Sequence, residues 1–456
     1  MPLANSMPLR KKSLLFRTGC SLLFLCFISP VFAQENSPYA RYGLGTTLPA
    51  TNVVNRGMGS IAAAYADPLS INFSNPASYS RFQVTTEPKS GKPLYGRVLF
   101  DVGINIENKT LREPDNAQKF SSSYGSFSHV QLGLPLNKSW GLSFGLRQLN
   151  RISYKVGETG AITDAATGAF IDSGYTQYSG NGGTFLPNIG TGIAIKNLSL
   201  GVNVGYLFGR REYSTTRTLY DTADFKTALY DAEASYGDLF FSGGAQYRIK
   251  LNGKTTLTLG VSGNLKQDIS ATNNINRASI GVAGDSTFVN RQRDIKGTII
   301  YPASYTGGFV LEHQVGTNGS FVFGTDLMRN EWSSYRYFDA PDSVRDNWQL
   351  RLGTQLRPDL KAGSGYFSNV TYRAGFYFGP DYIHVGRELP VYGISFGLGL
   401  PVANYNRLSP GQFTMVNVAL EYEKRGNNTN VLKENLFRLS IGLNFSDLWF
   451  NKRRYE

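Results

Sequence analysis

Cysteine is almost absent from this chain of 456 residues, and long apolar runs are absent after its N-terminal leader. The only two cysteines, Cys20 and Cys26, lie in that leader. The rest of the chain therefore offers no disulfide framework, no thiol nucleophile and no thiolate metal site. No later stretch reaches the roughly 18 apolar residues of a membrane-spanning helix. The three histidines, His129, His313 and His384, lack metal-ligand spacing, so we expect no metal and no cofactor.

The leader has the layout of a secretory signal peptide. Residues 10–12 are basic, residues 13–28 are largely apolar, and small residues end at Ala33. This pattern predicts a signal peptide over residues 1–33, with cleavage before Gln34. A membrane anchor is the alternative, but the apolar run falls short of the roughly 20 residues needed to cross a bilayer. A lipoprotein acceptor at Cys20 is a weaker alternative, because Arg-Thr-Gly precedes it.

The net charge is basic, but the basic residues are scattered. Removing the four basic residues of the leader leaves +9 of the +13 carried by the whole chain. The longest basic run in the body is Lys452-Arg453-Arg454. A nucleic-acid site needs a denser cluster. The charge pattern favours solvated loops that face an anionic membrane surface, and we expect no nucleic-acid partner.

Glycine and aromatic residues are plentiful, with 50 Gly, 27 Tyr and 29 Phe, and apolar residues recur at every second position. In residues 437–445, for example, Phe, Leu, Ile, Leu and Phe alternate with Arg, Ser, Gly and Asn. Such alternation predicts β-strands with one apolar face. The period alone fits both a soluble sandwich and a membrane barrel. The predicted strands cover 97–107, 126–136, 140–150, 184–196, 198–210, 237–250, 255–267, 298–313, 319–331, 347–357, 366–378, 390–401, 411–424 and 435–446.

The connections between these strands favour the barrel. Tight turns at 137–139, 197 and 251–254 alternate with long loops at 108–125, 151–183, 211–236 and 268–297. Short turns on one side and long loops on the other are typical of outer-membrane barrels. Strands in hydrocarbon must pair completely, so the sheet must close on itself. We therefore predict an all-β, antiparallel transmembrane barrel of 14 strands in the outer membrane of a Gram-negative cell. Trp140, Trp449 and Phe450 are expected at the membrane boundary.

The segment "DPLSINFSNPASYS", residues 67–80, precedes the first predicted strand and has no place in the wall. A barrel of this size is too wide to be filled by its wall side chains alone. We therefore predict that residues 34–95 form a hatch in the lumen, a barrel over residues 96–447 and a periplasmic tail over residues 448–456. A disordered periplasmic tail is the alternative for the N-terminal segment.

This N-terminal segment resembles the hatch of the FadL/TodX family of outer-membrane transport proteins. The resemblance includes an Asn-Pro-Ala motif, here Asn75, Pro76 and Ala77, after a Gly/Ala-rich stretch. The Ser37-Pro38-Tyr39 opening resembles the Bacteroidota-type branch, as does the Trp449-Phe450 ending. The rest of the chain fits the family layout of a hatch followed by 14 strands.

The resemblance implies passive uptake of hydrophobic compounds, such as long-chain fatty acids, by lateral diffusion through a gap in the wall. The expected partners are that ligand and outer-membrane lipids, and the expected state is a monomer without catalysis. In the family the third strand makes the gap. Here the neighbouring strand contains Pro187, which removes a ladder hydrogen bond. We place a wall seam near Pro187, between the third and fourth strands, with a simple strand end as the alternative.

Two other functions are considered. A FadL-like barrel can also act as an assembly or shuttle subunit of a protein secretion system, as PorV-like proteins do. A lipid-acting barrel enzyme has less support. The G-x-S-x-G pattern occurs at residues 141–145 and 393–397, but both copies lie inside alternating strands. That pattern marks a nucleophile only at a strand–turn–helix elbow, so these glycines and serines are expected simply to face the lumen.

Overall fold

The computed structural model describes residues 37–86, 93–114, 116, 118–164, 166–220, 227–281, 286–359, 365–402 and 412–449. The predicted signal peptide lies outside these residues, and so does most of the predicted C-terminal tail. Among the residues described, no helix is long and apolar enough to cross a membrane.

The wall is a closed antiparallel β-barrel of 14 strands, as predicted. Two of these wall strands are interrupted, one as β9 and β10 and the other as β11 and β12. The strands are β3 (Pro93–Arg112), β4 (Lys119–Asn137), β5 (Trp140–Thr163), β6 (Phe170–Ile195), β7 (Leu198–Leu219), β8 (Thr227–Lys250), β9 (Thr255–Asn264), β10 (Gln267–Ile280), β11 (Ser286–Tyr301), β12 (Ser304–Val315), β13 (Gly319–Asn330), β15 (Asn347–Arg357), β16 (Thr371–Val385), β17 (Arg387–Val402), β18 (Phe413–Arg425) and β19 (Lys433–Trp449).

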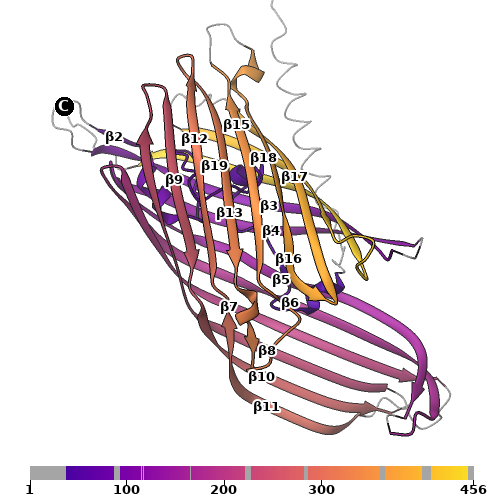
Figure 1. The fold of residues 1–456 in the computed structure, drawn as a ribbon. Helices are drawn as coiled ribbons and strands as arrows, with labels where there is room; N and C mark the ends of the chain where they lie inside the picture. Colours follow the sequence, from indigo (N-terminus) through magenta and orange to yellow (C-terminus); the bar gives the residue numbers. More distant parts are fainter. Residues whose placement is uncertain are drawn as a thin grey trace, which may run out of the picture. The chain divides into compact units, whose positions relative to one another are not determined.

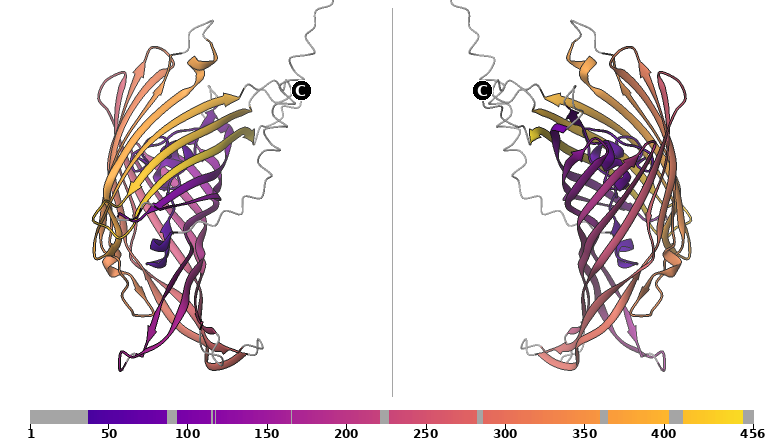
Figure 2. Two further views of the ribbon diagram at one scale, coloured as in Figure 1. Left: turned by 90° about the vertical axis from the view of Figure 1, so that its right-hand side faces the viewer. Right: turned by 90° about the vertical axis from the view of Figure 1, so that its left-hand side faces the viewer.

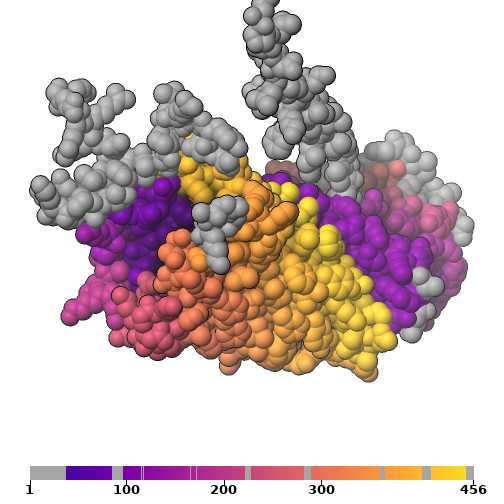
Figure 3. All heavy atoms as spheres, turned by 90° about the horizontal axis from the view of Figure 1, so that it is seen from above, coloured from indigo at the N-terminus to yellow at the C-terminus, as the bar shows by residue number. Residues whose placement is uncertain are grey.

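Closure joins the first wall strand to the last. β19 pairs with β3 over its whole length, from Lys433↔Arg112 to Trp449↔Gly96. Figure 3 shows the yellow C-terminal strands beside the purple N-terminal ones. No open edge is left at this seam, which is the condition for a sheet that lies in lipid.

The remaining elements are short. Five precede the wall, and three lie in its connections. They are η1 (Pro38–Arg41), β1 (Thr46–Thr47), α2 (Val53–Arg56), η2 (Pro76–Arg81), β2 (Val84–Thr86), η3 (Trp332–Ser334), β14 (Arg336–Tyr337) and η4 (Tyr366–Asn369).

Strand β7 illustrates how the alternating pattern forms a lipid-facing wall. Its outward side chains from Leu198 to Phe208 are apolar and mostly exposed, whereas Ser199 and Asn203 face inward and are buried. An apolar band of this length matches the 9–11 residues, roughly, of a transmembrane strand. Trp140 is likewise exposed at the start of β5, as expected for a boundary aromatic. We call this band of outward apolar residues the apolar belt.

Beyond the belt, strands β5–β8, β10 and β11 continue together past the other strands (Figure 1). The β5–β6 ladder continues to Ile162↔Asp172, and the β7–β8 ladder continues to Thr218↔Thr227. We call this sheet the outer extension; it comprises residues 151–163, 170–183, 210–219, 227–236, 268–280 and 286–297. Most of these residues were predicted as long loops, and that prediction was wrong. The apolar alternation fades in these residues, while Thr, Tyr, Val and Ile still favour strands.

Candidate functional site

The N-terminal segment, residues 37–86, lies inside the barrel (Figure 2). At the outer end, the Ser37 hydroxyl donates to Glu434, and β1 pairs with β5 through Thr46↔Arg151. At the inner end, β2 pairs with β3 through Val84↔Gly96. The segment therefore runs through the lumen from one half of the barrel to the other.

The Asn-Pro-Ala motif fixes the segment to the wall. The Asn75 side chain caps η2 by accepting from the Ala77 amide at 3.1 Å, and its Nδ2 donates to Ala63 O at 2.5 Å and to Val261 O on β9 at 3.2 Å. An asparagine at a helix N-cap satisfies an amide that has no partner within the helix. Here the same side chain also joins two turns of the segment to a wall strand. The predicted motif residues are thus brought together, and their role in transport stays a prediction.

Wall glycines receive the backbone of the segment. A Cβ on Gly201 would overlap the Pro76 carbonyl, and one on Gly244 would overlap the Asn75 side chain. The same holds for four further inward glycines around the barrel. They lie against the segment in the pairs Gly141 with Tyr79, Gly260 with Ala63, Gly353 with Met58 and Gly375 with Gly59. Glycine is the residue that allows so close a backbone approach. The inward glycines of the alternating strands therefore form the surface on which the segment rests.

Arg56 holds the centre of the segment to three wall strands. Its guanidinium donates to Ser128 on β4 at 2.7 Å, to Ser440 on β19 at 3.2 Å and to Asn105 on β3. It also donates to Thr51 O at 3.1 Å. Burial lowers the pKa of Arg56 to about 10, so the side chain stays charged at neutral pH.

The serines of the two G-x-S-x-G patterns lie in the wall and face the segment, as the alternating pattern predicted. Ser395 accepts from the Gly59 amide at 2.9 Å, and Ser143 lies 3.5 Å from Gln131. His129 is buried beside Asp101 at 3.1 Å, whereas His313 lies at the inner turn beside Thr255. Within the described ranges, no group of three or more His, Cys, Asp or Glu side chains could hold a metal ion.

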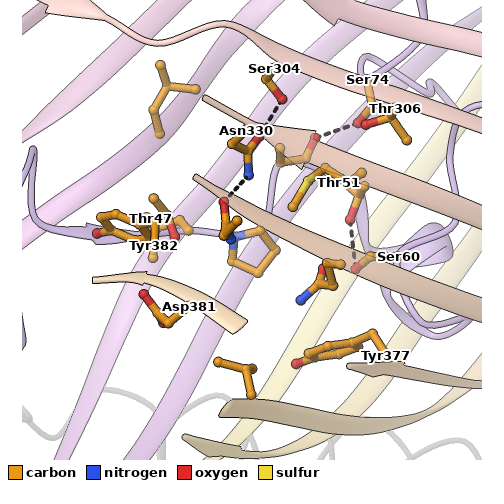
Figure 4. A pocket seen from close by; sticks show the side chains of 18 of the residues that line it. Thr47, Thr51, Ser60, Ser74, Ser304, Thr306, Asn330, Tyr377, Asp381 and Tyr382 are labelled. Carbon is orange, nitrogen blue, oxygen red and sulfur yellow. Dashed lines mark hydrogen bonds between the residues drawn. The ribbon is translucent and has the colours of Figure 1, made fainter. Parts of the chain in front are cut away.

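A cavity of about 320 Å³ lies between the segment and the wall. Its lining combines apolar residues, among them Leu149, Phe240 and Tyr301, with charged residues of β3, β18 and β19. Figure 4 shows hydroxyl groups of the segment, Thr51 and Ser60, on the same cavity. The cavity is therefore amphiphilic, and its charged lining was not foreseen from the sequence.

Most charges in the cavity are paired. Arg438 bonds Glu107 at 2.6 Å and Glu421 at 3.2 Å. Arg425 pairs in the same way with Asp381 at 2.7 Å and Glu434 at 3.1 Å.

Two cavity arginines form no ion pair with any carboxylate in the described part of the chain. Arg147 donates to Ala50 O at 3.4 Å, and Arg351 donates to Ser60 O at 3.3 Å. Each guanidinium is thus held against the backbone of the segment. A buried cation without a carboxylate partner attracts an anionic group.

The ladder at Pro187 is interrupted on one side only. On the β5 side the pairing runs through Leu146↔Pro187. On the β7 side the pairs stop at Phe185↔Phe208 and resume at Asn188↔Gly205. The ladder between the third and fourth strands is thus continuous at Pro187, and the break lies between the fourth and fifth. Passage of a ligand at Pro187 stays a prediction.

A longer interruption lies between β8 and its other neighbour. β8 pairs with β10 up to Tyr236↔Ala271 and with β9 from Gly243↔Gly263 onward. Residues 237–242 of β8 and residues 264–270 opposite them have no ladder partners across this seam. We call this interruption the wall gap. Register is not visible in a single sequence, so the strand pattern gave no signal for it.

A closed 14-stranded barrel with an apolar belt and an N-terminal segment in its lumen belongs to the class of outer-membrane β-barrels. A family model described as BamG matches residues 15–456, and the chain belongs to this family. No curated protein matches the chain significantly.

Solved structures of the same fold confirm the predicted FadL/TodX-type architecture. The "CymD monoaromatic hydrocarbon channel" is 15% identical with a TM-score of 0.51, over 88% of this chain and 98% of that one. A FadL homologue of Pseudomonas aeruginosa is 12% identical with a TM-score of 0.51, over 89% of this chain and 100% of that one. The narrower Bacteroidota-type branch stays a prediction.

Proposed function

We propose that this protein is a channel for the passive uptake of hydrophobic compounds, such as long-chain fatty acids, which leave it sideways through the barrel wall. The amphiphilic cavity is the observation that carries the proposal. It is lined by residues of the N-terminal segment, such as Thr51 and Ser60, and by wall residues that include Leu149 and Phe240. The fold is that of proteins described as hydrocarbon channels and FadL homologues.

The cavity offers groups for both ends of a fatty acid. Each CH₂ removed from water contributes roughly 0.8 kcal/mol, and Leu149, Phe240 and Tyr301 supply the apolar surface. The carboxylate would meet Arg147 and Arg351, the two cavity cations that form no ion pair with a carboxylate among the described residues. Charge-assisted hydrogen bonds of this kind are roughly twice as strong as neutral ones. A monomer in contact with outer-membrane lipids would suffice, and no catalysis is required.

Binding of two probes tests this assignment. The purified protein is titrated with palmitate and with 1-hexadecanol, which has the same chain and no charge. The combined variant Arg147→Met and Arg351→Met should weaken palmitate binding and leave hexadecanol binding unchanged. Arg329→Met is the matched control, because Arg329 is exposed on the outside of β13. If the wild-type protein binds neither palmitate nor 1-hexadecanol, the channel function is rejected.

An assembly subunit of a secretion system is the second candidate, and one observation favours it. The outer extension carries β5–β8, β10 and β11 well beyond the belt, and its outer face bears charged residues such as Arg210, Glu212 and Glu233. Such a surface suits a protein partner. Unchanged uptake of hydrophobic compounds in a deletion strain, together with a protein that co-purifies stoichiometrically, would support this candidate over the channel.

A further inference from the structure

The ladder between β4 and β5 ends partway along both strands. Its last pair is His129↔Arg147, yet β4 also covers residues 119–128 and β5 continues through residues 148–163. Each of these parts stays paired on its other edge, β4 with β3 and β5 with β6. The β3–β4 hairpin and the outer extension therefore separate here (Figure 1), and the edge of β5 that faces β4 has no wall strand beside it.

The N-terminal segment already uses the first part of this edge. β1 pairs with residues 150–151 of β5, and the Ser37 N–H donates to the Ser153 carbonyl at 3.4 Å. Beyond Ser153, residues 154–162 have no ladder partner on this side within the described ranges. We call residues 154–162 the open edge. A strand added there would continue a pairing that the protein's own segment begins.

The geometry of an antiparallel ladder defines which backbone groups the open edge presents. Successive residues of such a strand direct their N–H and C=O groups to opposite neighbours. The Ser153 carbonyl points away from β6, because it accepts from Ser37. The β5–β6 pairing has no register shift over residues 150–162 of β5, so this orientation recurs at every second residue. Both groups of residues 155, 157, 159 and 161 therefore point to the open side.

The opposite edge of the outer extension is protected against added strands. The pairing of β11 with β10 contains two register shifts, Asp294 has a φ of 55°, and residues 291–296 include four charged side chains. Bulges and charges of this kind oppose edge-to-edge pairing. The open edge of β5 has no register shift, its residues 155–161 are exposed, and only Lys155 and Glu158 are charged. The sheet therefore leaves one of its two edges available for pairing.

A polar cleft of about 750 Å³ lies beside the start of the open edge, between the tip of the β3–β4 hairpin and the outer extension. Hydroxyl groups dominate its lining, which includes Ser121, Ser122, Ser153, Ser179 and Ser214. Its charged lining residues are Lys119, Lys155 and Glu212, and Glu212 pairs with Arg210 at 3.1 Å. The lining therefore has more positive than negative charge and suits an acidic side chain.

We propose that the open edge docks an extended acidic peptide of a partner protein, which adds to β5 as a further strand and directs a carboxylate toward Lys119 and Lys155. In strand addition, main-chain hydrogen bonds supply the affinity and pockets for side chains supply the specificity. The site lies at the outer end of the barrel and needs no ligand in the lumen. Docking is therefore independent of the proposed channel function.

Two synthetic octapeptides test strand addition to the purified full-length protein. The parent peptide alternates threonine and valine and carries one central aspartate. Its control has the same side chains but methyl groups on alternate backbone nitrogens, which removes the donors along one edge. Methylation should weaken binding by roughly tenfold or more in fluorescence anisotropy. Equal binding of the two peptides, or no binding of the parent peptide at millimolar concentration, would overturn the proposal.

Variants of the open edge separate the backbone from the side chains. Thr159→Pro removes an N–H that points to the open side and leaves the bonds to β6 in place, so it should weaken binding of the parent peptide by roughly tenfold. Gly160→Ala is the control, because a Cβ there meets no atom within 4 Å. Equal binding by these two variants would contradict strand addition.

The charge of the cleft is tested by Lys119→Glu, which should weaken binding of the parent peptide. Lys254→Glu makes the same change at the exposed turn after β8 and should have no effect. Loss of affinity in both variants, or in neither, would show that the cleft does not select the aspartate.

Hydrogen exchange distinguishes the proposed occupant from others. The parent peptide should protect the amides of residues 155, 157 and 159 and leave those of residues 243–250 unchanged. Binding of lipopolysaccharide that Lys119→Glu abolishes, without protection by the peptide, would assign the cleft to an anionic glycan instead. A dimer in native mass spectrometry that Thr159→Pro dissociates would assign the edge to a second copy. Peptide binding by a protein that binds no palmitate would keep the docking edge and reject only the channel function.

Discussion

At the scale of single residues, the N-terminal segment is held by hydrogen bonds that water cannot easily replace. Arg56 is 1% exposed, and its guanidinium has acceptors on β3, β4 and β19. Loss of the guanidinium would leave buried hydrogen-bond acceptors without a donor. Each unsatisfied acceptor lowers the free energy of unfolding by about 1–3 kcal/mol. One side chain therefore ties the segment to the seam where the barrel closes.

The variant Arg56→Met should loosen the segment without unfolding the barrel, because the wall ladder does not involve this side chain. We expect a larger and noisier ion conductance in planar bilayers than the wild-type protein gives. Arg329→Met, which alters an exposed arginine, serves as the control. A conductance equal to that of the wild-type protein would show that Arg56 does not hold the segment in place.

Neighbouring glycines on β8 allow a second test at this scale. A side chain on Gly244 would overlap Asn75, whereas at Gly243 the nearest atom lies 3.5 Å away. Gly244→Val should therefore displace the segment and destabilise the protein by about 1–3 kcal/mol, the usual cost of overpacking. Gly243→Val should be neutral. The two variants are compared by the temperature at which the folded band disappears from a denaturing gel. Equal temperatures would contradict the close contact between Gly244 and Asn75.

At the scale of elements, the alternating pattern identified the strands wherever lipid meets one face. Residues 437–445 of β19 lie in the wall as predicted, with Phe437 and Leu443 exposed and Arg438 and Ser440 buried. The outer extension was missed because both faces of residues 210–219 are polar. The continuation of the strands there depends on pairing with neighbours, which a single sequence does not reveal.

The candidate site was only partly predictable for the same reason. Asn75 and its neighbours stand out as a local motif, and the structure brings them against the wall. The charged lining of the cavity combines Glu107 with Arg438, which lie far apart in the sequence and meet only when the barrel closes. An inward carboxylate or guanidinium at alternate strand positions, as at Glu421 and Glu423, is the signal that could have indicated it.

The sidedness of the hairpins gives a prediction at this scale. The turn after β5 ends the outer extension, and the turn after β8 lies at the opposite end of the barrel. Thr167→Cys should react with a membrane-impermeant maleimide on intact cells, whereas Asn252→Cys should react only after the outer membrane is permeabilised. The reverse labelling would mean that the barrel is inserted in the opposite orientation.

At the scale of the whole molecule, closure makes the barrel cooperative. Every ladder from β3 to β19 supports its neighbours, and the β19–β3 ladder completes the ring. The N-terminal segment adds contacts to many of these strands through Arg56, Asn75 and the wall glycines. Detergent must therefore break many backbone hydrogen bonds together before the chain can unfold.

We expect the protein to keep its folded form in cold sodium dodecyl sulfate and to migrate faster on a gel than a heated sample, because the compact barrel is smaller than the unfolded chain. Deletion of residues 433–449 removes β19 and the closing ladder, so this variant should show only the slower band. The full-length protein should also partition with the membrane fraction. Identical migration of heated and unheated full-length protein, with recovery in the soluble fraction, would contradict the closed barrel and every proposal that depends on its lumen.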